Sequence, residues 1–412
     1  MNTQKIELNN IDYGVKEDNL EPIYELYKGK LYSFLIKLFM NDCLEQFGTS
    51  IFSIKKSYAR TIANILSSYI FSLYITYDYS GDYFLPNNYE NTSLLEVILK
   101  DISKYDNNLV DIDNKISIIV SKLKQNYANQ LKMLDEYGKS DIFKNNKNNY
   151  KIKKSMIMNK KEMVFYKFDI KVNFNIKDKR LENILNNILI PVKIYDKLVS
   201  VYSGPNDKVD NYIWAILFRY QLLSSNNHQL AVLPSIMKQM NNVYGLNFEC
   251  FASAINNTFN NFCSIYYDLE RYFGSKGSFF RMQPIKGTFG FNPPYQKDVI
   301  DIGIRKLFTF LESEEELTFI ITIPVWDNEG KKELNDETQI DYGDFEIIKE
   351  IKENKFFRAL RIIPKEKFTY IDHNFELYKN KTIQNTYVIM LSNIPIEYIN
   401  VDCLNEYNFN IE

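Results

Sequence analysis

The spacing of apolar residues divides the chain into a first part predicted to be helical and a second part in which strands and helices alternate. Apolar residues recur at helical spacing through Glu21–Phe47, and Tyr58–Tyr77 continues with the same period. Ser93–Lys104 and Ile112–Tyr137 have the spacing of two further helices. We therefore expect roughly the first 140 residues to be mainly helical.

A basic stretch follows these helices. Lys144–Lys161 contains seven lysines and no acidic residue. Such a stretch is most often a solvated loop or sheet edge, but lysines also neutralise the phosphates of a nucleic acid without reading its sequence. Glu162–Lys177 then alternates apolar and polar residues, which predicts a strand, and Arg180–Val199 has helical spacing.

Strands and helices alternate after Tyr202–Asp210, where a glycine and a proline interrupt the pattern. The predicted elements are the strands Leu246–Phe251, Cys263–Tyr267, Gly287–Phe291, Thr318–Ile323 and Thr386–Leu391 and the helices Tyr212–Ser224, Pro234–Tyr244 and Lys297–Leu311. This alternation predicts an open, mostly parallel α/β sheet, in which ligands bind beyond the carboxyl ends of the strands. We expect a mainly helical domain at residues 1–205, with the basic strip near 144–161, and an α/β domain at residues 206–412.

Composition narrows the class of protein. A length of 412 residues suggests two or three domains, because single cores usually stop growing at roughly 250–300 residues. The formal net charge of −2 neither favours nor excludes a nucleic-acid partner. The four cysteines form no CxxC pair and there are only two histidines, so we expect no metal site and no disulfide framework.

The chain also shows no targeting signal. The N-terminal residues are polar and acidic, which excludes the apolar segment of a signal peptide, and no uncharged apolar run reaches the about 18 residues of a membrane span. We therefore expect an intracellular, soluble protein of the nucleus or cytoplasm without a membrane partner.

The tetrapeptide Asn292-Pro293-Pro294-Tyr295 directly follows a predicted strand. Two prolines fix two φ angles and hold the preceding residue extended, so the loop is stiff. It aims an asparagine side-chain oxygen and a backbone carbonyl at one point, and these two acceptors match the two N–H donors of an exocyclic amine. The tyrosine offers a face on which a base can stack. The loop therefore suits an adenine N6 amine that attacks a methyl sulfonium, with catalysis by positioning and electrostatics. The alternative is a rigid strand-to-helix turn.

A second segment has the pattern of a cofactor site. Glu249 ends a predicted strand, and Phe251, Ala252 and Ser253 follow it as a turn with small residues that let backbone approach a ligand closely. The alternative is a buried strand end at which Glu249 caps a helix. After the next predicted strand, Asp268 is placed to accept hydrogen bonds from two ribose hydroxyls.

Together these segments resemble the cap-specific adenosine N6-methyltransferase family, also called phosphorylated-CTD-interacting factor. The similar segments are Ile213–Tyr220, Phe248–Ser253, Tyr272–Gly277, Gly287–Phe289, Asn292–Tyr295, Ile323–Trp326 and Gln384–Thr386. The resemblance covers about half of the chain, roughly from Asp210 to Asn393, and the order and spacing of the segments match. Two departures are Tyr295, where the family usually has phenylalanine, and Val325, which replaces an acid.

The resemblance implies a Rossmann-like class I methyltransferase domain that uses S-adenosyl-L-methionine and releases S-adenosylhomocysteine. The implied substrate is m7G-capped RNA that begins with adenosine, methylated at N6 of the first transcribed adenosine to give m6A or m6Am. In the family the Asn-Pro-Pro-aromatic loop is catalytic, which carries over to Asn292, Pro293, Pro294 and Tyr295. No N-terminal WW module is visible, so association with RNA polymerase or the capping machinery is not implied.

Further residues are predicted to lie in the site. Phe273 offers a ring for the cofactor adenine. The candidates for lining the cap pocket are Arg219, Trp326, Arg358, Arg361 and Tyr370, for each of which a structural role is the alternative. Two other functions stay open: an adenine N6-methyltransferase acting on DNA or internal RNA, and a non-catalytic nucleic-acid-binding subunit with a methyltransferase fold.

Overall fold

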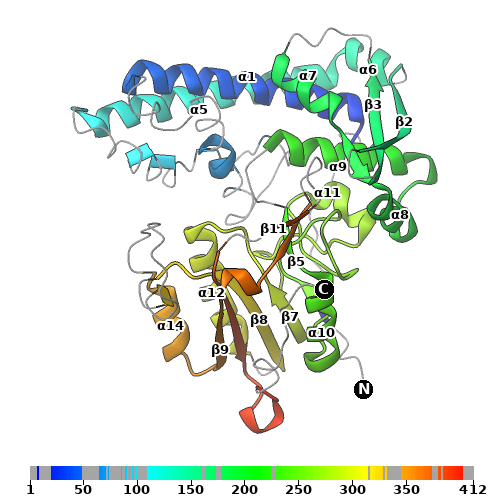
Figure 1. Cartoon of the computed structure of the whole chain (residues 1–412). Helices are drawn as coiled ribbons and strands as arrows, with labels where there is room; N and C mark the ends of the chain where they lie inside the picture. The colour runs from blue at the N-terminus through cyan, green and yellow to red at the C-terminus, as the bar shows by residue number, and fades with distance from the viewer. Residues whose placement is uncertain are drawn as a thin grey trace. The chain divides into compact units, whose positions relative to one another are not determined.

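The chain forms two compact units in the computed structural model (Figure 1). The helical unit comprises Val15–Asn226, and the sheet unit comprises Met1–Gly14 with Asn227–Glu412. The structure describes residues 7–8, 20–48, 65–70, 73, 85, 89–90, 92, 95–96, 99–100, 109–147, 149–159, 163–172, 178–223, 229–313, 316–327, 330–331, 345–373, 379–381 and 384–401. The division at Asn226 lies one helix after the expected boundary near residue 205, because α9 (Val209–Leu223) packs on α1 (Pro22–Phe47) within the helical unit.

The long helices of the helical unit follow the sequence pattern. Pro22 occupies the first turn of α1, where its missing N–H costs nothing, and Gly48 ends the helix with a φ of 72°. α5 (Ile112–Lys139) packs along α1 and confirms the helix expected at Ile112–Tyr137. Most of Tyr58–Tyr77 and Ser93–Lys104 lies outside the described residues.

The basic stretch forms the edge of a small antiparallel sheet. The strands β2 (Lys151–Met158), β3 (Val164–Lys171) and β4 (Leu189–Pro191) pair in that order. The single helix expected at Arg180–Val199 was wrong, because Ile190 of β4 pairs with Tyr166 of β3. The chain there forms α7 (Lys179–Asn186), β4 and α8 (Val192–Val201). The short α6 (Asp141–Lys147) precedes the sheet.

The sheet unit combines helices with a mixed sheet, as an α/β architecture does. Its strands are β1 (Glu7–Leu8), β6 (Phe248–Glu249), β7 (Pro284–Phe291), β8 (Leu317–Pro324), β9 (Phe357–Ile363) and β12 (Thr386–Ser392). The central strands β6, β7 and β8 are parallel neighbours, and β12 lies antiparallel between β8 and β9. Parallel bridges from Glu249 to Phe262 and from Phe262 to Ser275 extend the sheet beyond β6. β1 pairs antiparallel with β7. The expected mostly parallel sheet was wrong, because β1, β9 and β12 pair antiparallel with their neighbours.

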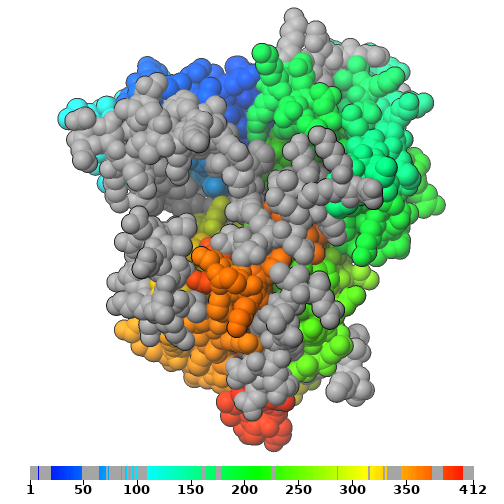
Figure 2. Space-filling model, in the orientation of Figure 1, coloured from blue at the N-terminus to red at the C-terminus, as the bar shows by residue number. Residues whose placement is uncertain are grey.

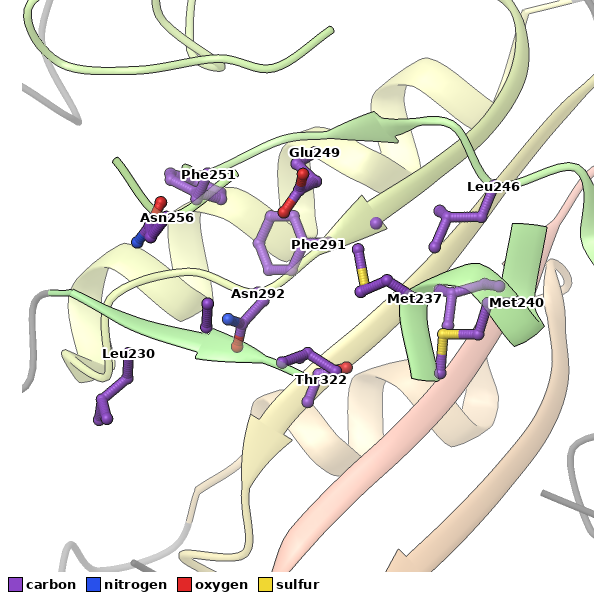
Figure 3. Close-up of a pocket in the computed structure, with 14 residues that line it drawn as sticks. Leu230, Met237, Met240, Leu246, Glu249, Phe251, Asn256, Phe291, Asn292 and Thr322 are labelled. Carbon is purple, nitrogen blue, oxygen red and sulfur yellow. The ribbon is translucent and has the colours of Figure 1, made fainter. Parts of the chain in front are cut away.

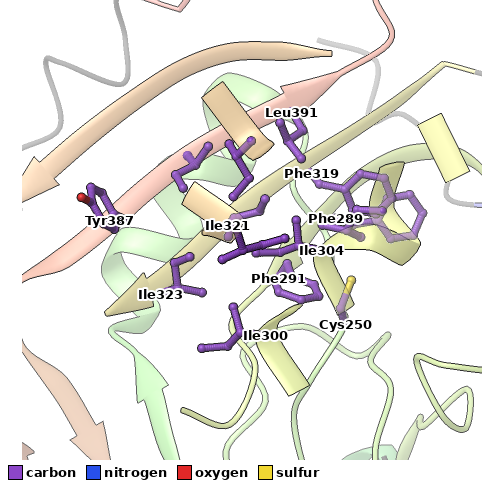
Figure 4. Packing of buried hydrophobic residues seen from close by; sticks show 14 of the residues in the cluster. Cys250, Phe289, Phe291, Ile300, Ile304, Phe319, Ile321, Ile323, Tyr387 and Leu391 are labelled. Atoms are coloured by element: carbon purple, nitrogen blue, oxygen red, sulfur yellow. The ribbon is translucent and has the colours of Figure 1, made fainter. Parts of the chain in front are cut away.

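Apolar side chains cover both faces of this sheet. Every residue of β8 is buried, as the sequence pattern of a strand covered on two sides predicts. On one face, the helices α12 (Lys297–Leu311) and α14 (Ile347–Glu353) pack on residues such as Phe291 and Ile321 (Figure 4). On the other face, α10 (Pro234–Tyr244) packs on Ile320 and Met390. β10 (Tyr370–Asp372) is part of a three-stranded sheet with β5 (Leu230–Val232) and β11 (Lys379–Lys381).

The order of the strands creates a switch in chain direction between β6 and β7. From β6 the chain runs outward through Phe262 to Ser275, and then returns to form β7 on the other side of β6. Ligands of open α/β sheets bind at such a point, outside the carboxyl ends of the strands. In this protein that place is next to Glu249 and Asn292.

Among the described residues, no helix is long and apolar enough to cross a membrane. The same residues contain no group of three or more histidine, cysteine, aspartate or glutamate side chains that could hold a metal ion.

Candidate active site

A pocket lies at the switch between β6 and β7 (Figure 3). Glu249 ends β6, Asn292 follows β7, and Thr322 comes from β8. Met237 and Met240 of α10 form part of the apolar wall. The free volume of the pocket is about 20 Å³, room for about one water molecule. Two side chains predicted from the sequence, Glu249 and Asn292, thus meet at one cavity.

The loop Asn292–Tyr295 is held by packing at both ends. Phe291 is fully buried, and its ring contacts the rings of Phe251 and Phe279 at centroid distances of 5.2 and 5.4 Å. A Cβ atom at Gly303 of α12 would lie 2.6 Å from Cζ of Phe291, so only glycine leaves room for this ring. On the other side the loop runs into α12 at Lys297. The stiff loop expected from the two prolines therefore starts from a fixed strand end.

The Tyr295 hydroxyl joins the loop to residues far away in the sequence. It lies 3.3 Å from Asn292 Oδ1 and 2.6 Å from the Tyr370 hydroxyl. The Tyr295 ring also packs edge to face with Trp326 and with Tyr370, at centroid distances of 6.4 and 6.0 Å. Burial is the main reason that the pKa of Tyr295 rises well above its usual value, and the neighbouring Tyr370 raises the pKa further. The hydroxyl is therefore neutral in the physiological pH range.

Glu249 has a structural contact besides lining the pocket. Its Oε1 atom accepts hydrogen bonds from the backbone N–H groups of Thr258 and Phe259, at 2.6 and 2.9 Å. The carboxylate thus holds the loop that follows β6 while it faces the cavity. The alternative of a helix cap was wrong, because Thr258 and Phe259 lie in a bend and not in a helix. A cofactor contact of Glu249 stays a prediction.

Among the other predicted cofactor residues, only Phe251 lines the pocket. Ala252 donates its backbone N–H to the carbonyl of Cys263. The Ser253 hydroxyl lies 2.9 Å from Gln229 Oε1 and 3.0 Å from Asn256 Oδ1. These two residues shape the turn around the pocket. Asn256, which the sequence reasoning did not single out, lines the pocket itself.

The strand expected at Cys263–Tyr267 was wrong, and this changes the surroundings of Asp268. The pairing is limited to a bridge at Phe262, and helix α11 (Tyr267–Glu270) begins at Tyr267. Asp268 and Phe273 are buried and are not part of the pocket wall. Glu270, which is fully buried, accepts hydrogen bonds from the backbone N–H groups of Ala254 and Tyr266 at 2.7 and 3.3 Å. It therefore stabilises the turn after β6.

Two of the five candidates for the cap pocket are brought to the Asn292–Tyr295 loop. Trp326 and Tyr370 contact Tyr295, and Tyr370 is fully buried. Arg358 donates hydrogen bonds to the backbone carbonyls of Ile394 and Lys355 at 3.2 and 2.9 Å, which is a structural role. Arg361 lies on β9 opposite Val388, and burial lowers its pKa.

Arg219 is a structural residue of the helical unit. Its side chain is fully buried in α9, and its Nε and Nη2 atoms contact the two oxygens of Glu25. Burial raises the pKa of the Glu25 carboxyl, but the charges of Arg219 and Lys28 outweigh this and lower the pKa to about 2. The sequence alone does not reveal this partner, because Glu25 is distant in the chain.

The helical unit presents a basic face on the β2–β3 hairpin. Lys151 lies directly opposite Lys171, and Lys153 and Lys167 lie on the same face. Asp169 also lies on this face, directly opposite Lys153, and pairs with Lys167 at 3.4 Å, so the face keeps a net positive charge. Lys151, Lys153 and Lys171 are exposed, and the teal-green surface at the upper right of Figure 2 includes this hairpin. Two like charges directly opposite each other destabilise a strand pair, so an anionic ligand on this face would be favourable. We call these four lysines the basic face.

Comparisons with known proteins identify relatives of the middle of the chain. The model of the family described as "Phosphorylated CTD interacting factor 1 WW domain" matches residues 193–372, which contain the pocket and the Asn292–Tyr295 loop. A protein named mRNA (2'-O-methyladenosine-N(6)-)-methyltransferase from Homo sapiens is 29% identical over 191 residues. The Mus musculus protein of the same name is 28% identical over 191 residues. These alignments cover 44% of this chain and 26% of each relative, so the chain matches about a quarter of their length.

Proposed function

We propose that this chain, which over residues 193–372 is a relative of the phosphorylated CTD interacting factor 1 family, is an adenosine N6-methyltransferase that uses S-adenosylmethionine. The proposed substrate is m7G-capped RNA whose first transcribed nucleotide is adenosine, in the nucleus or cytoplasm. The observation that carries this proposal is the place of Asn292: it follows β7 at the edge of the pocket between β6 and β7.

The strand order supports a Rossmann-like class I methyltransferase domain. From one edge to the other, the order runs Ser275, Phe262, β6, β7, β8, β12, β9, with β12 antiparallel to both neighbours. All the strands from Ser275 to β8 are parallel, and the pocket is at the switch in this parallel part. This is where an open α/β sheet binds a nucleotide-like ligand.

The residues around the pocket fit parts of S-adenosylmethionine, which would supply an electrophilic methyl group. Glu249 offers a carboxylate to the positively charged amino or sulfonium end, and Phe251 offers an apolar ring. The enclosed space has room for about one water molecule, so a larger ligand would extend from it toward solvent or displace side chains of the wall. Met237 and Met240 are suited to this, because unbranched methionine side chains adapt easily. Roles for Ala252, Ser253, Asp268 and Phe273 in cofactor binding stay predictions.

The loop would position the target amine. The Asn292 side-chain oxygen and the Pro293 carbonyl are two acceptors for the two N–H groups of adenine N6. Accepting these bonds favours a more tetrahedral nitrogen and directs its lone pair to the reacting methyl group. Tyr295 would stack on the adenine, with its ring held by Trp326 and Tyr370. No strong base is required first, because the nitrogen loses its proton readily once it is methylated.

The basic face supports a nucleic-acid partner. Its lysines suit the phosphates of an RNA chain, which bind by charge without regard to sequence. The charge of this face is local, which is consistent with a net charge close to zero for the whole chain.

A substrate panel with labelled cofactor tests the proposal. Capped RNA beginning with adenosine is compared with uncapped RNA of the same sequence, capped RNA beginning with guanosine, and DNA. We expect methyl transfer to the first RNA only, and loss of activity in Asn292→Ala with cofactor affinity retained. Equal methylation of uncapped RNA would refute the cap substrate, and activity on DNA would favour the alternative DNA methyltransferase. An absence of cofactor binding in calorimetry would favour a non-catalytic subunit.

A further inference from the structure

A chain of hydroxyl groups connects the catalytic loop to the start of β12. Tyr295 Oη lies 2.6 Å from Tyr370 Oη, and Tyr370 Oη lies 3.0 Å from Thr386 Oγ1. Thr386 Oγ1 lies 3.3 Å from the backbone carbonyl oxygen of Gln384. At the other end, Tyr295 Oη lies 3.3 Å from Asn292 Oδ1. The three hydroxyls thus link two acceptors that cannot donate, Asn292 Oδ1 and the Gln384 carbonyl.

The hydrogen bond between the two tyrosines gives this chain a direction, because Tyr295 is its donor and Tyr370 its acceptor. Each hydroxyl has one proton, and the Gln384 carbonyl can only accept, so Thr386 donates to it. The Tyr370 proton is then left for Thr386, and every proton is used once. Of the two contacts of the Tyr295 hydroxyl, the contact to Tyr370 at 2.6 Å is the shorter and stronger, and the contact to Asn292 is 3.3 Å long. The Tyr295 proton therefore lies toward Tyr370 and away from Asn292.

Tyr370 Oη and Asn292 Oδ1 are two possible acceptors for the Tyr295 proton, and burial limits the other partners that this proton could find. Tyr370 and Thr386 are fully buried, and Tyr295 is partly buried between the rings of Trp326 and Tyr370. Burial also raises the pKa of both tyrosines, so both hydroxyls keep their protons. Without an acceptor at Tyr370, the nearest acceptor for the Tyr295 proton would be Asn292 Oδ1, 3.3 Å away.

We propose that Tyr370 is a positioning residue: by accepting the Tyr295 proton, it keeps Asn292 Oδ1 available as an acceptor for the target amine. This inference rests on the proposed function, because it assigns the hydroxyl chain a role at the same loop. Tyr370 is fully buried and acts through Tyr295. Tyr370 determines which acceptor the Tyr295 hydroxyl donates to. In this way it determines how strongly Asn292 Oδ1 can accept a hydrogen bond from adenine N6.

A double-mutant cycle tests the proposal on capped RNA beginning with adenosine. Tyr370→Phe removes the acceptor, the Tyr295 proton turns to Asn292, and kcat falls by about tenfold, the effect of one neutral hydrogen bond in the transition state. KM for RNA changes little, because the effect is limited to the reacting amine. When Tyr295→Phe is already present there is no proton to redirect, so adding Tyr370→Phe lowers kcat no further. If Tyr370 only supported the fold, its loss would lower kcat equally in both backgrounds, which would overturn the proposal.

The other end of the hydroxyl chain gives an independent variant. Thr386→Val preserves the shape of the strand residue but removes the acceptor for the Tyr370 proton. We expect this variant to lower kcat in the same direction, and Thr386→Ser, which keeps the hydroxyl, to retain activity. Equal activity of the valine and serine variants contradicts a directed chain.

Unfolding measurements separate failure of this inference from failure of the proposed function. The coupling between Tyr295→Phe and Tyr370→Phe in urea unfolding reports the hydroxyl pair without requiring activity. If the wild-type chain methylates no RNA or DNA, the proposed function fails and the positioning role fails with it, even where this coupling is present. If the wild type is active and Tyr370→Phe is equally active, only the positioning role fails.

Discussion

The guanidinium group of Arg219 binds both carboxylate oxygens of Glu25, with two N···O distances of 2.7 Å and no exposure of the Arg219 side chain. Lys28 contacts the same carboxylate at 2.8 Å. Because all three groups are buried, each charge depends on the others for stabilisation. This cluster joins α1 to α9 and so stabilises the helical unit.

Removing one member of this cluster should destabilise the unit strongly. In Arg219→Met we expect the free energy of unfolding in urea to fall by about 3–5 kcal/mol, because a buried carboxylate loses its main partner. The matched control is Lys139→Ala, which breaks the exposed Lys139–Asp135 pair on α5 and should change the free energy by less than about 1 kcal/mol. Equal effects of the two variants would mean that the buried cluster contributes no more than a surface pair.

The same cluster predicts sensitivity to acid. The pKa of Glu25 is lowered to about 2 in the folded protein, below the ordinary value of 4.5 that applies after unfolding. A lowered carboxyl pKa contributes stability that is present above pH 4.5 and is lost as pH falls toward 2. Urea unfolding of the wild type at several pH values should show this loss, and Glu25→Gln should reduce its slope. If Glu25→Gln left the slope of unfolding free energy against pH unchanged, Glu25 would not be a source of the acid sensitivity.

Gly303 links the packing of α12 to the Asn292–Tyr295 loop. A Cβ atom in Gly303→Ala would lie 2.6 Å from Phe291 Cζ, so the ring that fixes the end of β7 has to shift. We expect a loss of stability of about 1–3 kcal/mol and a lower kcat, although alanine favours a helix more than glycine does. Thermal unfolding and turnover on capped RNA measure both effects. The half-exposed neighbour Ile302 serves as the control, and Ile302→Ala should leave kcat unchanged.

The basic face predicts a salt-dependent contribution to RNA binding. Replacing Lys151 and Lys171 together by alanine should weaken binding of RNAs of different sequence by similar factors. It should also reduce the slope of log affinity against log salt by about 1 for each phosphate that the protein no longer neutralises. Fluorescence anisotropy at several salt concentrations measures this. Lys132→Ala with Lys139→Ala removes the same charge from the exposed part of α5 and serves as the control. If both double variants lost the same RNA affinity, the effect would come from the net charge of the protein and not from a binding site on the basic face.

Local sequence patterns were sufficient to predict the elements on either side of the Asn292–Tyr295 loop. The predicted helix Lys297–Leu311 and the predicted helix Pro234–Tyr244 have the same bounds as α12 and α10. The strand Gly287–Phe291 is the second part of β7, so Asn292 does follow a strand end. These predictions depend on helix periodicity, on strand residues and on proline, which act within a few neighbouring residues.

The sequence by itself thus determined the helix periodicity, the stiff Asn292–Tyr295 loop and its place after a strand. Only the tertiary structure decided which distant groups meet that loop. Tyr370 contacts Tyr295 from 75 residues away, and Thr386 contacts Tyr370 in turn. Arg219 pairs with the buried Glu25, which is 194 residues away. The pairing after β6 is limited to Phe262, and Asp268 lies in helix α11 instead of following a longer strand. Contacts between strands decided this as well. The physical reason is that hydrogen bonds and burial between remote segments outweigh local preferences of about 1 kcal/mol per residue.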